Sequence, residues 1–140
     1  MNYTIPAKPT TYKGVRYRSR LEAKWAAFFE ICGISAFYEP FDLEGWTPDF
    51  LVPNYKGSRL LVEVKPADTF DEGAASKMQF ALGRCDFIGW PVLFGLAPNC
   101  VWCVGVPQVI KRTFTEDWEP LWSEAHNLTR FHKEPWEIAA

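Results

Sequence analysis

The chain has 140 residues, of which 48% are hydrophobic and 16% aromatic. This length suits one packed domain and leaves no room for two. No apolar run approaches the roughly 20 residues that a membrane helix needs, and the first residues lack the apolar core of a signal peptide. We therefore expect a cytoplasmic protein with no membrane partner. The net charge of −2 argues against a broadly basic nucleic-acid-binding protein.

The charge is divided unevenly along the chain. Residues 1–20 carry five cations and no acid, whereas residues 21–140 carry the other ten cations and all 17 acids. Because residues 1–16 show no sustained hydrophobic period, we interpret them as a basic arm before a single domain at 17–140. Tyrosines interleave with the cations, a mixture that can neutralise phosphates and stack on exposed bases. The predicted nucleic-acid-binding residues are Lys8, Lys13, Arg16, Arg18 and Arg20, and the tyrosines are Tyr3, Tyr12 and Tyr17. A solvated arm without this role is the alternative.

Hydrophobic periodicity predicts the elements in chain order. From residue 18 to about 32, apolar residues recur on one helical stripe that ends before Gly33. Short strands follow at 37–39, 41–43, 49–52 and 60–65, separated by Pro- and Gly-containing breaks. Helical spacing returns from 74 to 85, two buried-type strands follow at 91–96 and 100–106, and a last helix spans 117–131. The predicted order is αβββαβ with a further strand and helix appended.

Two carboxylates and a lysine stand out on the third and fourth predicted strands. Asp49 opens the strand after Pro48, and the turn-rich residues 53–58 predict a hairpin that brings Asp49 close to Glu63. Because strand side chains alternate, Glu63 and Lys65 share one face. Two neighbouring carboxylates repel each other unless a hard divalent cation lies between them, and oxygen ligands suit Mg²⁺ or Mn²⁺. The pattern is typical of metal-assisted phosphodiester cleavage.

An αβββαβ order with Pro48-Asp49 before one strand and Glu63-Val64-Lys65 on the next resembles the core of the PD-(D/E)xK nuclease superfamily. The helix that begins Arg18-Ser19-Arg20-Leu21-Glu22 is similar to that of the branch containing phage junction-resolving and TnsA-like transposon endonucleases. The resemblance covers about residues 17–106. It implies a three-layer, restriction-endonuclease-like α/β fold with a mixed central sheet. It also implies a metal site formed by Glu22, Asp49, Glu63 and the Val64 carbonyl, with Lys65 beside the attacking water.

The function that this resemblance implies is a Mg²⁺-dependent DNA endonuclease, in which Mn²⁺ substitutes, with 5′-phosphate and 3′-hydroxyl products. Its catalytic residues would be Glu22, Asp49, Glu63 and Lys65. Cleavage of both strands or of a junction would require a homodimer or a partner protein. The alternatives are a catalytically silent nucleic-acid-binding module and a nuclease subunit that depends on a partner.

Glu22 has two interpretations. Ser19-Arg20-Leu21-Glu22 has the S-x-x-E pattern of a capping box, in which the glutamate closes the start of a helix and needs no metal. Glu22 also borders the apolar stripe through Trp25 and Phe29, where a plain solubilising charge is unfavourable. Both readings, cap and metal ligand, stay open. Glu39 likewise suits either a place beside the same cleft or an ordinary edge-strand charge.

Overall fold

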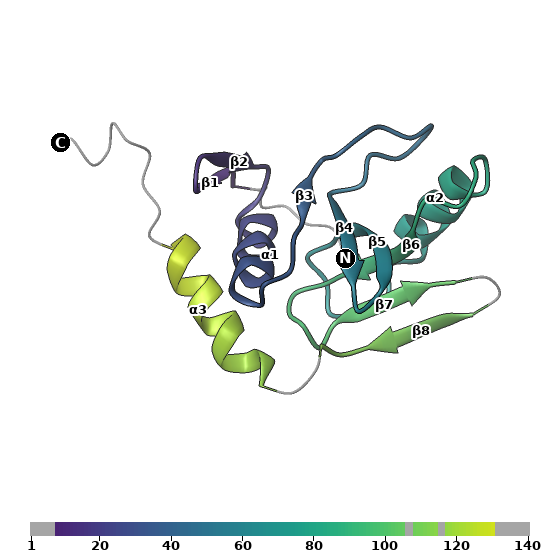
Figure 1. The fold of residues 1–140 in the computed structure, drawn as a ribbon. Helices are drawn as coiled ribbons and strands as arrows, with labels where there is room; N and C mark the ends of the chain where they lie inside the picture. Colours follow the sequence, from purple (N-terminus) through teal and green to yellow (C-terminus); the bar gives the residue numbers. More distant parts are fainter. Residues whose placement is uncertain (1–7, 106–107, 115–116, 131–140) are drawn as a thin grey trace.

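The fold was analysed in a computed structural model, which describes residues 8–105, 108–114 and 117–130 (Figure 1). These residues form three helices, a mixed six-stranded sheet and a two-stranded sheet. The helices are α1 (Arg20–Ile31), α2 (Glu72–Leu82) and α3 (Trp118–Arg130). The small sheet pairs β1 (Thr10–Tyr12) with β2 (Val15–Tyr17). The large sheet contains β3 (Phe37–Tyr38), β4 (Phe50–Tyr55), β5 (Ser58–Val64), β6 (Trp90–Phe94), β7 (Val101–Val104) and β8 (Val109–Arg112).

The strands of the large sheet lie side by side in chain order, from β3 to β8. Neighbouring strands are antiparallel except β5 and β6, which are parallel and are connected through α2. A parallel pair needs such a crossover, whereas a hairpin turn suffices for antiparallel neighbours. The order α1-β3-β4-β5-α2-β6 therefore confirms the predicted αβββαβ succession and the mixed sheet.

Helices cover both faces of the large sheet, which gives three layers (Figure 1). On one face α1 and α3 bury an aromatic core, in which Trp25 is fully buried and its ring lies 4.7 Å from that of Trp122 and 4.4 Å from that of Phe94. On the other face α2 packs Met78 against Leu61 and Leu93. Among the described residues, no helix is both long enough and apolar enough to cross a lipid bilayer.

The predicted arm contains a β-hairpin. Residues 10–17 form β1 and β2, joined by a two-residue turn in which Lys13 and Gly14 have φ of 48° and 81°. Both central residues of a type I′ turn need positive φ, and glycine supplies this without strain. Tyr12 and Tyr17, which are only 6% and 7% exposed, belong to the aromatic core. The prediction that these two rings stack on bases is therefore wrong, because they stabilise the fold; Tyr3 lies outside the described residues.

Three local predictions on the large sheet also differ from the structure. Residues 41–43 form no strand, and Leu43 makes only an isolated bridge to Trp46. β4 continues through Pro53 to Tyr55, because the register shift between Val52 and Tyr55 accommodates a residue without an N–H. The turn is instead Lys56-Gly57, with φ of 50° and 88°. β8 was not predicted, since all four of its residues are exposed and it has no buried period.

Candidate active site

Asp49 and Glu63 lie beside each other on the α2 face of the sheet. The Asp49 amide donates to the Val62 carbonyl at 2.8 Å, and Phe50 pairs with Val62, so Asp49 stands opposite Glu63. Asp49 Oδ2 accepts a hydrogen bond from the Val64 amide at 2.8 Å. Both carboxylates are buried, with only 8% and 7% of Asp49 and Glu63 exposed. The predicted proximity of the two carboxylates is thus present in the structure, and the Val64 backbone is part of the arrangement through its N–H.

The electrostatics of this pair favour an added positive charge or a shared proton. Burial and, after it, the charge of Glu63 together raise the pKa of Asp49 from 3.8 to about 8, against the opposing effect of the Val64 amide. A smaller contribution comes from the charge of Glu22. A second negative charge at this position is therefore costly unless a cation compensates for it. Either a shared proton or a hard cation would offset the repulsion between the two carboxylates.

Glu63 has two polar partners besides Asp49. The Trp46 indole Nε1 donates to Glu63 Oε2 at 2.5 Å, and the Lys77 ammonium lies 3.5 Å from the same oxygen. Trp46 comes from the loop between β3 and β4, and Lys77 comes from α2, so the carboxylate is held from two sides. Sequence reasoning missed Trp46 because an indole in a loop carries no periodic signal. The Lys77 side chain is 43% exposed although its ammonium pairs with Glu63.

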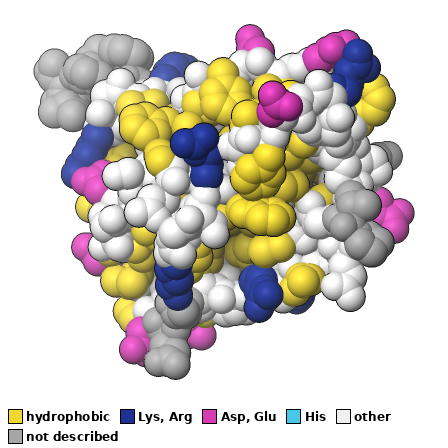
Figure 2. Space-filling view, turned by 45° about the vertical axis from the view of Figure 1, so that its right-hand side comes forward, with side chains coloured by type: hydrophobic (Ala, Val, Ile, Leu, Met, Phe, Trp, Pro, Cys, Tyr) yellow, Lys and Arg dark blue, Asp and Glu magenta, His cyan; other side chains and the backbone are white. Residues whose placement is uncertain are grey.

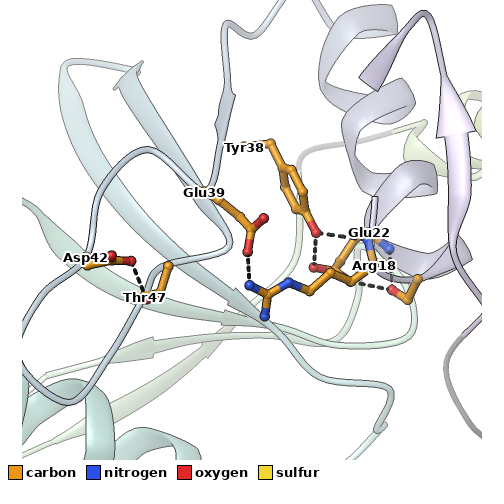
Figure 3. A network of polar contacts seen from close by, with 7 residues as sticks. Arg18, Glu22, Tyr38, Glu39, Asp42 and Thr47 are labelled. Atoms are coloured by element: carbon orange, nitrogen blue, oxygen red, sulfur yellow. Dashed lines mark hydrogen bonds and ion pairs between the residues drawn. The ribbon is translucent and has the colours of Figure 1, made fainter. Parts of the chain in front are cut away.

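Glu22 is a buried carboxylate with hydroxyl partners (Figure 3). Ser19 is the N-cap of α1 and accepts from the Glu22 amide at 3.1 Å, which confirms the serine half of the predicted capping box. The Glu22 side chain accepts from the Ser19 hydroxyl at 2.7 Å and from the Tyr38 hydroxyl at 3.0 Å. A capping box needs neither a buried carboxylate nor a tyrosine donor. The structure therefore shows that Ser19 caps α1 and that two hydroxyl groups hold the Glu22 carboxylate in one orientation.

Glu39 turns away from the carboxylate pair. Its amide donates to the Asp49 carbonyl at 2.8 Å, which places it next to Asp49 across the strands. Its backbone has φ of 44°, a left-handed conformation that interrupts the strand alternation. Its carboxylate forms an ion pair with Arg18 at 2.5 Å (Figure 3). The side chain is thus part of a link between β3 and the start of α1.

These positions define how the acidic groups fit a metal ion. Within residues 8–105, 108–114 and 117–130, no three Asp, Glu, His or Cys side chains are already grouped to hold one. Asp49 and Glu63 alone provide a pair of oxygen ligands whose mutual repulsion a cation relieves. Glu22 is held by Ser19 and Tyr38, yet it is close enough to influence the Asp49 pKa. The donor chemistry suits Mg²⁺ or Mn²⁺, with two carboxylates side by side and a third nearby.

Lys65 follows β5 directly. Its amide donates to the Phe94 carbonyl at 2.8 Å, so the ladder with β6 continues one residue beyond Val64. Strand alternation would then put the Lys65 side chain on the face of Glu63, and this position stays a prediction. The residue is half-buried, and its ammonium makes no ion pair with any described residue. Lys65 therefore offers an uncommitted positive charge beside the carboxylate pair.

The five predicted DNA-binding cations lie in different surroundings. Lys13 pairs with Glu30 of α1, and Arg18 pairs with Glu39. The others, Lys8, Arg16 and Arg20, are exposed. Two of the five charges thus stabilise contacts within the chain, which reduces the phosphate contacts that this segment offers.

An apolar cavity lies away from the carboxylates. Its volume is about 540 Å³, and apolar side chains such as Leu60, Ile110 and Phe114 line it on the α1 face of the sheet. None of the predicted site residues contributes to its walls. The carboxylate pair is therefore not part of this apolar cavity.

No protein-family model, curated protein or solved structure matches the chain. The functional interpretation consequently depends on the residues of the site and on the sequence resemblance.

Proposed function

We propose that the protein is a Mg²⁺-dependent DNA endonuclease with a restriction-endonuclease-like core. The observation that carries the proposal is the buried Asp49–Glu63 pair, in which burial and the neighbouring charge raise the pKa of Asp49 to about 8. Two buried carboxylates side by side are unfavourable for folding unless a proton or a cation offsets their charge, which supports a role for a cation. The αβββαβ order and the adjacent Lys65 support the same family.

Each residue has a chemical role in this proposal. Asp49, Glu63 and the Val64 carbonyl would hold a divalent cation, and Glu22, oriented by the Tyr38 hydroxyl, would complete that site or hold a second ion. When bound, the cation lowers the pKa of its water and offsets charge on the phosphate. Lys65 orients the attacking water or stabilises the negative charge that develops on the phosphate oxygens.

The residues around the carboxylates keep the site in shape before the cation binds. The Trp46 indole donates to Glu63, and the Lys77 ammonium offsets its negative charge. The Val64 amide fixes one oxygen of Asp49, which leaves the other directed to the cation or to a proton. These contacts set the direction of both carboxylates, which is a requirement for a metal site of defined geometry.

A nuclease subunit that relies on a partner for DNA targeting is the second candidate. The observation that favours it is the charge distribution, since the protein has a net charge of −2 and pairs Lys13, Arg18 and Lys77 internally. These three of the 15 cations are thus paired within the chain and acids outnumber cations overall, which disfavours the phosphate contacts that dominate affinity for DNA. This candidate binds Mn²⁺ but cuts DNA slowly alone.

The test is cleavage of supercoiled plasmid and of a synthetic four-way junction, each with Mg²⁺ and with chelator. An active endonuclease cuts at least one substrate with Mg²⁺ and neither with chelator. Calorimetric titration with Mn²⁺ separates the remaining cases, because a partner-dependent nuclease binds the ion and a catalytically silent module does not.

A further inference from the structure

A large apolar side chain lies exposed on the edge strand beside the carboxylate pair. Phe37 is 56% exposed, and among the described strands β3 pairs only with β4. The next residue, Tyr38, packs its ring 4.5 Å from Tyr17 and 5.3 Å from Phe50, on the α1 face. Because side chains alternate along a strand, Phe37 faces the α2 side, where Asp49 and Glu63 lie.

The register places Phe37 next to Asp49. Phe37 pairs with Leu51, and Asp49 lies two residues before Leu51 on the same face. Phe37 and Asp49 are therefore diagonal cross-strand neighbours, whose Cα atoms lie about 7–8 Å apart, within reach of an aromatic side chain. A nucleotide whose phosphate lies at the carboxylate pair would bring its base near the Phe37 ring. The ring is held on a strand, so it is already positioned.

The charges around the site make a contribution from base contacts necessary for firm binding. Three cations are paired within the chain, as Arg18–Glu39, Lys77–Glu63 and Arg84–Glu44, and Lys77 among them lies 3.5 Å from the Glu63 carboxylate. On the face drawn in Figure 2, Lys and Arg side chains are scattered among acidic and hydrophobic ones and form no continuous basic stripe. Phosphate contacts alone would then give weak binding at physiological salt. Stacking of a base on an aromatic ring adds affinity that does not depend on counterion release.

We propose that Phe37 is a stacking site for an unpaired base, and that the enzyme selects DNA in which a nucleotide next to the scissile phosphate is unpaired. In a closed duplex the same base is stacked on its neighbours and cannot reach the ring. Single-stranded DNA and the splayed arms of branched DNA offer that base freely. The proposal rests on the proposed function for the identity of the ligand as DNA, and it names the substrate class of the same site.

The experiment measures DNA binding in the full chain. All proteins carry Asp49→Asn and are kept in chelator, so that DNA is not cut. Fluorescence anisotropy gives the affinity for a labelled 12-nucleotide single strand and for the matching 12-base-pair duplex. The test variant is Phe37→Ala and the conservative variant is Phe37→Tyr. The matched control is Phe87→Ala, because Phe87 is 69% exposed and precedes β6, whose residue Trp90 pairs with Leu60 toward the start of β5, away from Glu63.

We expect Phe37→Ala to weaken single-strand binding by between about 5-fold and about 150-fold, the range of one stacked base. Duplex binding should change less than about 2-fold, and Phe37→Tyr and Phe87→Ala should bind as the parent does. The fold-change in single-strand affinity caused by Phe37→Ala should be the same at low and at high salt, since stacking releases no counterions. Unchanged single-strand binding, or equal loss for both DNA forms, would overturn the proposal.

Two further measurements keep the outcomes distinct. Thermal unfolding checks that Phe37→Ala is folded. Light scattering gives the mass of the protein in solution. If Phe37→Ala has a smaller mass than the parent, Phe37 lies in a contact between two copies and the proposal is wrong. The result is also independent of catalysis. Loss of single-strand binding in Phe37→Ala with no cleavage by the wild type would refute the endonuclease and retain the stacking site. Normal cleavage by the wild type together with unchanged single-strand binding in Phe37→Ala would retain the endonuclease and refute the stacking site.

Discussion

Substitution of Asp49 by asparagine should stabilise the metal-free protein at alkaline pH. The pKa of Asp49 is raised from 3.8 to about 8, first by burial and then by the charge of Glu63. Asparagine has nearly the same shape, retains an oxygen that accepts from the Val64 amide, and presents an NH₂ group that can donate to Glu63. Asp49→Asn therefore removes the buried charge and keeps the contacts.

The sign and size of the change in stability with pH follow from the pKa values of Asp49 in the folded and the unfolded protein. A carboxyl group whose pKa is higher in the folded state contributes stability that is complete below the unfolded value and is lost as pH rises through the folded value. Between pH 4 and 8 the unfolded chain has released the proton while the folded chain still holds it. Each pH unit in this window costs about 1.4 kcal/mol of the free energy of unfolding, which amounts to a loss on the order of 5 kcal/mol over the window.

The assay is urea unfolding in chelator at pH 5 and at pH 8.5. The free energy of unfolding of the wild type should fall by several kcal/mol between pH 5 and pH 8.5, whereas that of Asp49→Asn should change little. Asp49→Asn should therefore be the more stable protein at pH 8.5. Asp42→Asn, at an exposed carboxylate of the β3–β4 loop, is the control and should keep the wild-type slope. Mn²⁺ should narrow this difference in stability, because ion at 100 times its Kd adds about 2.7 kcal/mol to the protein that binds it. A wild-type stability that is flat with pH, or an equal slope in Asp49→Asn, would refute the reasoning.

Three further predictions test single contacts. Glu22→Gln retains an oxygen that accepts from Ser19 and Tyr38, so the melting temperature should hardly change while cleavage and Mn²⁺ affinity fall steeply; near wild-type cleavage would leave Glu22 as a cap alone. Lys77→Met removes the ammonium 3.5 Å from Glu63, so calorimetry should show tighter Mn²⁺ binding than in Lys77→Arg, and weaker binding would show that this lysine does not compete with the ion. Tyr17→Ala removes a ring from the aromatic core and should lower the free energy of unfolding by about 3 kcal/mol, whereas a solvated arm predicts no change in chemical denaturation.

The carboxylate pair was predictable because it depends on local rules. The period of a strand placed Glu63 and Lys65 on one face, and an intervening turn was enough to bring Asp49 opposite Glu63. The turn lies later than Pro53, at Lys56-Gly57. The Asp49–Glu63 pairing is unaffected, because the register from Phe50–Val62 to Val52–Leu60 is regular and the one extra residue of β4 is absorbed between Val52 and Tyr55.

The hairpin at 10–17 was missed for a related reason. Lys13-Gly14 has the same chemistry as Lys56-Gly57, and lysine is a less familiar residue than asparagine at the first position of such a turn. Three-residue strands also carry too few side chains for a visible alternation. The tyrosines of this hairpin were read as ligands for bases because their burial depends on α1, a contact that sequence does not show.

The partners of the carboxylates were beyond sequence reasoning. Trp46 and Tyr38 donate to Glu63 and Glu22 across 17 and 16 residues of chain. Such contacts depend on the path of a loop and on the angle between a helix and the sheet, neither of which has a periodic signature. Glu39 has a left-handed backbone, and its carboxylate pairs with Arg18, which lies 21 residues earlier in the chain. This contact also depends on the tertiary fold and has no periodic signal in the sequence.

Metal-dependent cleavage by matched variants tests the central claim most directly. The wild type, Asp49→Asn, Glu63→Gln and Lys65→Ala are incubated with the four-way junction and supercoiled plasmid in Mg²⁺, and Asp42→Asn serves as the control for an exposed carboxylate. We expect the wild type and Asp42→Asn to cut with Mg²⁺ and not with chelator, and each site variant to cut at least about 100-fold more slowly while its melting curve stays cooperative. Cleavage that persists in Asp49→Asn and Glu63→Gln would contradict the assignment of this carboxylate pair as the active site.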